Sequence, residues 1–180
     1  MARYRRSRRY RRRSGRWAPN IVKISALNDA APGEFFNSED LALNPPQINT
    51  GVSQTFTVKN FEITFTIEPA ITQSIQALES ITAYIMYVPQ GMNVTSGYYA
   101  EHPEYIMAYK YLGSPSNYVS PSSSYIQETQ QYQPYRIRTR LSRKLQTGDK
   151  IILYIQGSNE DSSSRQYRID GLVRWWSKAN

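Results

Sequence analysis

The highest density of charged side chains in the sequence lies in residues 1–16, MARYRRSRRYRRRSGR. They contain nine arginines and no acidic residue. A guanidinium group binds two phosphate oxygens at once and stacks on bases, which an ammonium group does not do. Tyr4 and Tyr10 lie between the arginines and can stack on unpaired bases. The segment therefore predicts binding of single-stranded nucleic acid, with an affinity that falls as salt rises. The predicted phosphate-binding residues are Arg3, Arg5, Arg6, Arg8, Arg9, Arg11, Arg12, Arg13 and Arg16.

The same segment is too highly charged to fold on its own. Its few apolar and aromatic side chains bury too little surface to offset the entropy of ordering the chain. We therefore expect residues 1–16 to form a disordered arm when no ligand is bound. Such a basic run can also act as a nuclear localisation signal. Membrane contact is disfavoured, because no apolar face accompanies the charge.

The rest of the chain, residues 17–180, is close to neutral. Nine of the 22 basic residues belong to the arm, which leaves 13 basic residues against 14 acidic ones. This length suffices for one hydrophobic core and is short for two. We expect two parts, the arm (1–16) and a single domain (17–180).

The composition argues against several classes of function. The chain has no cysteine, and His102 is its single histidine, so thiolate chemistry and multi-histidine metal sites are impossible. The acidic pairs Glu39-Asp40 and Glu160-Asp161 have no catalytic spacing and no glycine-rich phosphate loop. No run of about 18 apolar residues could span a membrane. We predict no enzyme activity, no catalytic residues, no metal and no cofactor.

A second basic stretch, YRIRTRLSRKL, occupies residues 135–145. In a strand, alternate side chains face opposite sides, so the arginines at 136, 138 and 140 would share one face. Ile137, Thr139 and Leu141 would share the other. The stretch either follows phosphates along a groove or pairs with acidic side chains of neighbouring strands or subunits, and both alternatives stay open. Its basic residues are Arg136, Arg138, Arg140, Arg143 and Lys144.

The elements that must position these residues are predicted to be β-strands. The 15 tyrosines and the many β-branched residues favour pleated, half-buried surfaces, and no amphipathic helix is evident. Residues 102–113 fit either a short helical turn started by Pro103 or a strand, and residues 29–53 and 113–134 are loop-like. The pattern favours an antiparallel all-β sandwich or barrel. Strands are predicted over residues 20–27, 55–67, 80–88, 135–141, 150–156 and 167–176.

Some positions in these strands carry further predictions. A bulge near Lys59-Asn60 would explain a change in the parity of apolar residues, and Gly171 interrupts the last strand. Trp175 and Trp176 must face opposite sides. Burial of both in the core is the simpler expectation, and the alternative places one at a subunit interface. Further candidates for subunit contacts are Tyr98, Tyr99, Tyr118, Tyr125, Tyr132 and Tyr135.

Several phrases of the sequence resemble capsid proteins of small circular single-stranded DNA viruses, the circovirus-like CRESS-DNA viruses. They cover about a third of the chain. The phrases are ITAYIMYVPQG (81–91), HPEYIMAYKYLGSP (102–115), YRIRTRLSRKLQTGDKIILYIQGSN (135–159) and GLVRWWSKAN (171–180). The chain is shorter than circovirus capsid proteins and has fewer loops for surface projections.

The resemblance implies a single eight-stranded antiparallel jelly-roll sandwich. It also implies self-assembly into an icosahedral shell of about 60 copies that packages the viral DNA through the arm. The arm would bind host nuclear import receptors, and the protein would occupy the virion and the host nucleus and cytoplasm.

Two alternatives remain, one of another class and one that is also a viral coat protein. One is a monomeric single-stranded nucleic-acid-binding module with a basic tail, which normally spreads its charge over the folded body. The other is a coat protein of a satellite RNA virus, because phosphate contacts do not distinguish DNA from RNA. An enzyme with a basic tail is disfavoured, since no carboxylate spacing supports it.

Overall fold

Alternating burial of side chains marks the strands in the computed structural model, which describes residues 16–43, 55–69, 78–113 and 134–179. Within a strand, every second side chain faces the core, as the pleated backbone requires. Helical structure in the described residues is limited to α1 (Tyr98–Glu101) and the 3-10 helix η1 (Pro103–Tyr105). The strands are β1 (Ala18–Ala30), β2 (Gly33–Leu43), β3 (Phe56–Pro69), β4 (Leu78–Val88), β5 (Ile106–Gly113), β6 (Tyr135–Arg138), β7 (Ser142–Leu145), β8 (Lys150–Asn159) and β9 (Arg165–Ala179).

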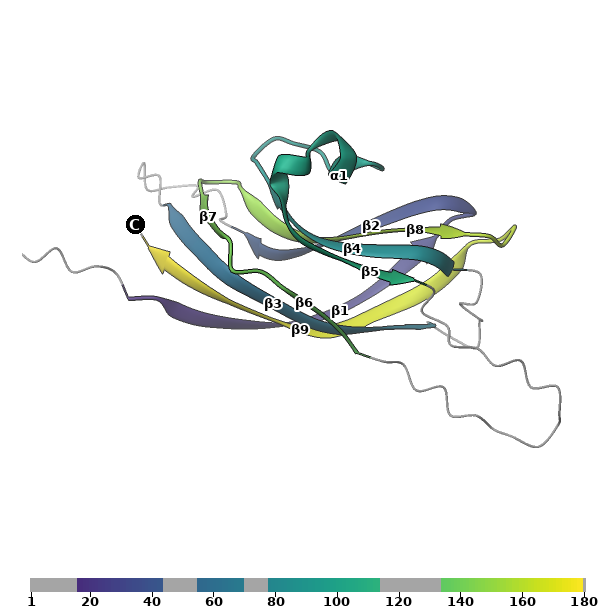
Figure 1. The fold of residues 1–180 in the computed structure, drawn as a ribbon, viewed down its shortest axis with the longest axis horizontal. Helices are drawn as coiled ribbons and strands as arrows, with labels where there is room; N and C mark the ends of the chain where they lie inside the picture. Colours follow the sequence, from purple (N-terminus) through teal and green to yellow (C-terminus); the bar gives the residue numbers. More distant parts are fainter. Residues whose placement is uncertain (1–15, 44–54, 70–77, 114–133, 180) are drawn as a thin grey trace, which may run out of the picture.

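The strands pair in a nested order that defines the fold. β1 pairs with β9, β2 with β8, β3 with both β6 and β7, and β4 with β5, all antiparallel. Additional pairing of β3 with β9 and of β4 with β8 produces two sheets. The first sheet has the order β1-β9-β3-β6 with β7 also on β3, and the second has the order β2-β8-β4-β5. The two sheets stack as layers (Figure 1). This is the predicted antiparallel jelly roll, with one of its eight strands divided into β6 and β7.

The main core lies between the two sheets. Phe61, Phe65 and Ile169 of the first sheet are buried together with Leu153 and Ile155 of the second. A smaller cluster lies on the outer side of the second sheet, where α1 and η1 cover it (Figure 1). The second sheet is therefore covered on both sides over part of its area, whereas the first sheet leaves its outer side exposed.

Most of the predicted strands are present and extend further than expected. β1 continues to Ala30 and β9 to Ala179. The predicted bulge in β3 is confirmed, because the register with β9 shifts between Lys59 and Glu62 and Asn60 has φ of 55°. Residues 102–113 combine both alternatives, since η1 is followed directly by β5.

Two strand predictions are wrong. Residues 29–53 contain β2, whose two-residue period is interrupted by a register shift between Asp40 and Ala42. Residues 135–141 are not one strand, because ladder pairing ends at Arg138 and the backbone N–H of Thr139 then donates to the carbonyl of Phe61. Leu141 is consequently exposed instead of facing the core.

The two adjacent tryptophans face opposite sides of β9, as predicted. Trp175 is 8% exposed and stacks on Phe61, with ring centroids 5.7 Å apart. Trp176 is 36% exposed on the outer side of the first sheet, so the expectation that both are buried is wrong. The prediction for Tyr98 is also wrong, because this first residue of α1 is buried against the second sheet and cannot serve as an accessible contact.

Gly171 allows a close approach between β9 and β3. A Cβ atom at this position would lie 2.5 Å from the carbonyl oxygen of Thr64 and 2.9 Å from the Cα of Phe65. These are backbone atoms of a central strand pair and cannot move aside without disturbing the sheet. A side chain at this position would therefore strain the middle of the first sheet.

We predict that Gly171→Ala lowers the free energy of unfolding by about 1–3 kcal/mol, the usual cost of overpacking. Leu172→Ala is the matched control, because Leu172 is exposed and its truncation should change stability by about 0.5 kcal/mol or less. Denaturant titration of both variants measures the difference. Equal stability of the two variants would contradict the close approach.

Candidate nucleic-acid interface

The outer side of the first sheet carries an excess of positive charge. Strand alternation turns eight basic and four acidic side chains outward on this sheet. The acidic ones are Asp29, Glu62, Glu68 and Asp170. We call the basic set the basic face: Lys23, Lys59, Arg136, Arg138, Lys144, Arg168, Arg174 and Lys178.

The predicted basic stretch is only partly on this face. Arg136 and Arg138 project outward from β6, and Lys144 projects outward from β7. Arg140 is exposed in the segment between these strands. Arg143 turns away, because its guanidinium donates to the carbonyl of Glu104 over 2.6 Å and lies 5.7 Å from the ring of Tyr87.

Glu62 neutralises part of the stretch. It forms ion pairs with Arg136 and, at 3.2 Å, with Arg138. The hydrogen bond from Arg136, supported by that from Arg138, holds the pKa of the Glu62 carboxyl below its usual value. The alternative of pairing with acids on a neighbouring strand therefore holds for these two arginines.

Five members of the basic face were not predicted from the sequence: Lys23, Lys59, Arg168, Arg174 and Lys178. Lys23, Lys144, Arg174 and Lys178 have no ion-pair partner among the residues that the structure describes. Arg168 lies 4.0 Å from Asp170. The even spacing of Arg168, Arg174 and Lys178 in the sequence could have predicted that they share one face of β9. Only strand pairing brings them beside Lys23 and Lys144.

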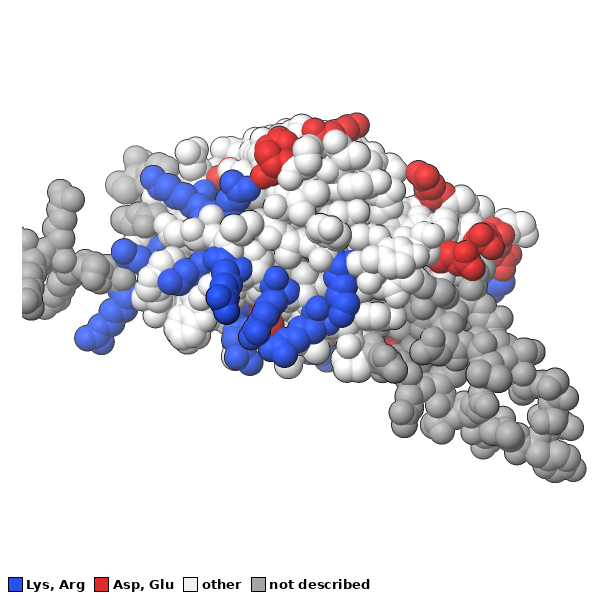
Figure 2. Space-filling view, in the orientation of Figure 1, with Lys and Arg blue, Asp and Glu red and all other residues white. Residues whose placement is uncertain are grey.

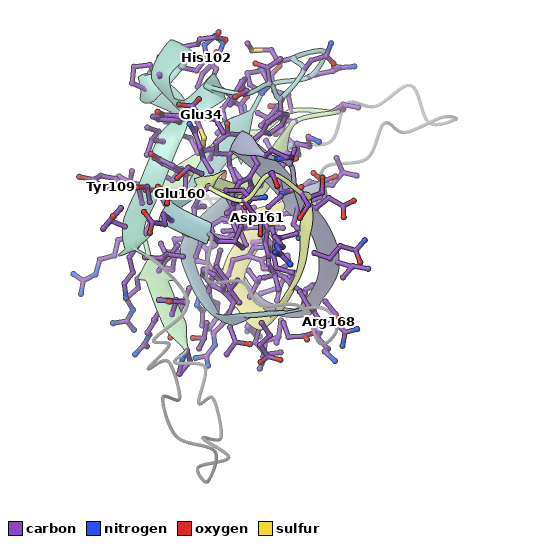
Figure 3. The ribbon with its side chains drawn as sticks, turned by 90° about the vertical axis from the view of Figure 1, so that its right-hand side faces the viewer. Glu34, His102, Tyr109, Glu160, Asp161 and Arg168 are labelled. Atoms are coloured by element: carbon purple, nitrogen blue, oxygen red, sulfur yellow. The ribbon has the colours of Figure 1, made fainter. Side chains whose placement is uncertain are left out.

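Acidic side chains gather on the remaining sides of the domain. Glu34 and Asp40 belong to β2, Glu79 to β4, and Glu160 and Asp161 to the turn between β8 and β9. Figure 2 shows the basic residues over the β6 and β7 edge and the adjoining first sheet, with acidic residues near α1 and at the far end. In Figure 3, Glu34 and His102 lie toward the second sheet and Arg168 lies on the opposite side.

Some of these acids have partners. Asp40 pairs with Lys150 at 3.0 Å, and Asp161 pairs with Arg165. The hydrogen bond from Arg165 lowers the pKa of Asp161, whereas burial, helped by Asp40, raises the pKa of Glu39. The net charge of residues 17–180 is near zero, but the basic residues lie mainly on the outer side of the first sheet and the acidic residues mainly elsewhere.

The arm leaves the domain beside the basic face. Arg16 is exposed and precedes β1, which is a strand of the first sheet. The eight arginines from Arg3 to Arg13, with Tyr4 and Tyr10, lie outside the described residues, as do Tyr118, Tyr125 and Tyr132. Their roles stay predictions. Arg16 therefore joins the domain at β1, an edge strand of the sheet that carries the basic face.

The described residues also bear on two other kinds of feature, a metal site and a membrane span. Over residues 16–43, 55–69, 78–113 and 134–179, no group of three or more His, Cys, Asp or Glu side chains is arranged to hold a metal ion. No helix within these ranges has the length and apolar character needed to cross a membrane. His102 is half-buried against the rings of Tyr98 and Tyr105, and its Nδ1 lies 3.4 Å from Oε1 of Glu104.

Comparisons with known proteins give distant likenesses only. No family model matches the chain, and no curated protein matches its sequence. Among solved structures, the decameric BFDV capsid protein is 4% identical, with a TM-score of 0.37, over 92% of this chain and 100% of that chain. Infectious bursal disease virus of the Gx strain is 7% identical (TM-score 0.36), and the VP2 subviral particle of infectious bursal disease virus is 10% identical (TM-score 0.33). Each of these two matches covers 88% of this chain, which spans 32% of the matched chain. At these identities and TM-scores the likenesses assign no activity.

We predict that Glu62→Gln strengthens binding of single-stranded DNA, because it frees Arg136 and Arg138 and removes one negative charge from the basic face. The slope of log affinity against log salt should steepen by about one to two. The melting temperature should change little, because exposed ion pairs contribute little to stability.

Glu34→Gln is the matched control, since it makes the same charge change on the second sheet. Protonation of Glu62 should have the effect of the substitution, so wild-type affinity should approach that of the variant as pH falls through the lowered pKa. Equal effects of the two substitutions would show that DNA does not contact the basic face.

Proposed function

We propose that this chain is a viral coat protein that assembles into a closed shell around single-stranded nucleic acid. The observation that carries the proposal is that the described chain begins at Arg16, next to an edge strand of the sheet that carries the basic face, while most described acidic residues lie elsewhere. Copies arranged with their first sheets inward would surround the nucleic acid with positive charge. The jelly-roll fold occurs in many viral capsids and also in lectins and cupins, so the fold alone does not distinguish a coat protein from these other proteins.

Exposed apolar side chains on the strands at the sheet edges support assembly. Leu43 of the edge strand β2 is 52% exposed, and Tyr109 of the edge strand β5 is 69% exposed. Long exposed edges with apolar side chains favour association, and monomeric proteins normally protect them. Second copies of this chain would cover these edges, and burial of tyrosine at such contacts is favourable.

The charge of the arm fits the packaging of a small genome. With about 60 copies per shell, as the sequence resemblance implies, nine arm arginines per copy supply roughly 540 positive charges against one negative charge per nucleotide. The opposite charges elsewhere on each domain let neighbouring domains pack without strong repulsion. The sequence resemblance favours circular single-stranded DNA as the genome. It also supports a second use of the arm as a nuclear localisation signal during infection.

We predict that the full chain, expressed alone, sediments as a multi-megadalton particle with a high ratio of absorbance at 260 nm to that at 280 nm. The nucleic acid inside should resist nuclease. Analytical ultracentrifugation at both wavelengths measures mass and content together. A single boundary near 20.8 kDa that binds oligonucleotides reversibly would contradict assembly and favour a monomeric binding module.

Deletion of residues 1–16 separates packaging from folding. The truncated domain should unfold cooperatively, because the core between the two sheets is built from residues between Ile24 and Trp175. Its particles should contain much less nucleic acid. Unchanged nucleic-acid content per particle would contradict the role of the arm. Loss of cooperative unfolding would show that the arm is structural.

A further inference from the structure

An exposed tryptophan lies beside lysines where the arm joins the domain. Trp176 has no stacking partner among the described aromatic rings, whereas its neighbour Trp175 stacks on Phe61 in the core. Trp17 is next to Arg16, and the Nζ of Lys59 lies 3.9 Å from the centroid of its ring. The two indoles therefore lie on the same side of the first sheet as the end of the arm.

The strand register places these residues in two adjacent rows. In one row, Trp176 of β9 lies opposite Lys59 of β3. In the next row, Lys178 of β9 lies opposite Thr57, which lies opposite Lys144 of β7. Residues opposite one another in paired strands have Cβ atoms about 4.5–5.5 Å apart and share a face. We call Trp17, Lys59, Lys144, Trp176 and Lys178 the indole–lysine cluster.

The cluster contains no acidic side chain. Glu62 is the acidic residue that follows along β3, and it is already paired with Arg136 and Arg138. Lys144 and Lys178 make no ion pair with a described residue. The positive charge around Trp176 is therefore available to an anionic ligand.

An exposed indole surrounded by lysines suits one ligand particularly well. A single-stranded nucleic acid presents an unpaired base with a flat π face and a phosphate on either side of it. Stacking of a base on an aromatic side chain adds affinity that does not depend on base identity, and the lysines neutralise the adjacent phosphates. A duplex would not fit in this way, because its bases are already stacked and paired.

We propose that the indole–lysine cluster binds an unpaired base of single-stranded nucleic acid by stacking on Trp176, while Lys59, Lys144 and Lys178 contact the flanking phosphates. This inference rests on the proposed function, because it names the contact that holds the packaged strand next to Arg16, where the arm joins the domain. The stack on Trp176 contributes affinity that is insensitive to salt, in addition to the salt-dependent contribution of the lysines and arginines. The competing role for Trp176 is a contact between subunits.

The test uses the full chain, disassembled and freed of packaged nucleic acid at high salt. Two labelled oligodeoxynucleotides of equal length are compared, an oligothymidylate and an abasic strand with the same number of phosphates. Affinities are measured by fluorescence anisotropy over a series of salt concentrations. Trp176→Ala should weaken binding of oligothymidylate by about 5- to 150-fold, the range measured for loss of one base–aromatic stack. Its affinity for the abasic strand and its salt slope should stay unchanged. Leu172→Ala, an exposed truncation on the same face of β9, is the matched control and should bind like the wild type.

A second measurement needs no substitution and so does not depend on the folding of a variant. The chain has three tryptophans, and Trp175 is shielded in the core, so quenching of intrinsic fluorescence reports on Trp17 and Trp176. Oligothymidylate should quench this fluorescence and the abasic strand should not.

Four results would overturn the inference. The first is equal quenching of the intrinsic fluorescence by both strands. The second and third concern Trp176→Ala, which would lose affinity equally for both strands or keep the wild-type affinity for oligothymidylate. The fourth is a smaller assembly of Trp176→Ala with unchanged DNA affinity, which would place Trp176 at a subunit contact. If the wild-type chain binds neither strand, the proposed function fails with it. If it binds both strands equally well and with a steep salt dependence, the inference alone fails.

Discussion

Burial of alternate side chains along β9 is the constraint on which the rest of the structure depends. β9 lies between β1 and β3 in the first sheet, and Tyr167, Ile169, Val173 and Trp175 point from it into the core. Because the side-chain period of a strand is two, this burial also turns Arg168, Arg174, Trp176 and Lys178 outward. A shift of one residue would turn four charged side chains, Arg168, Asp170, Arg174 and Lys178, toward the core side. The same packing that holds the sandwich together therefore also positions the outer side of the first sheet.

The nested pairing of strands turns a nearly neutral sequence into a domain with sorted charges. Basic residues far apart in the sequence, from Lys23 to Lys178, meet on one sheet because the first strand pairs with the last. The acids of β2 and of the turn between β8 and β9 are kept away from that face. Such a domain can face a polyanion on one side without an overall charge that would oppose packing between copies.

The features that depend on local pattern were predictable from the sequence, and those that depend on strand pairing were not. The arginine density of the arm, the bulge at Asn60 and the opposite orientations of Trp175 and Trp176 each follow from neighbouring residues. β2 was missed because a bulge interrupts its period. The partner of Arg136 and Arg138 is Glu62, more than 70 positions away, and no local pattern indicates it. The basic face was hidden for the same reason, since its members come from five strands.

The central claim of this account is that the first sheet faces enclosed nucleic acid. Electron cryomicroscopy of particles formed by the full chain tests it most directly. The account predicts a shell in which the outer side of the first sheet lines the inner surface against nucleic-acid density, with the second sheet and α1 toward the outside. A shell with the basic face on the outer surface, or between subunits and away from the nucleic acid, would contradict it.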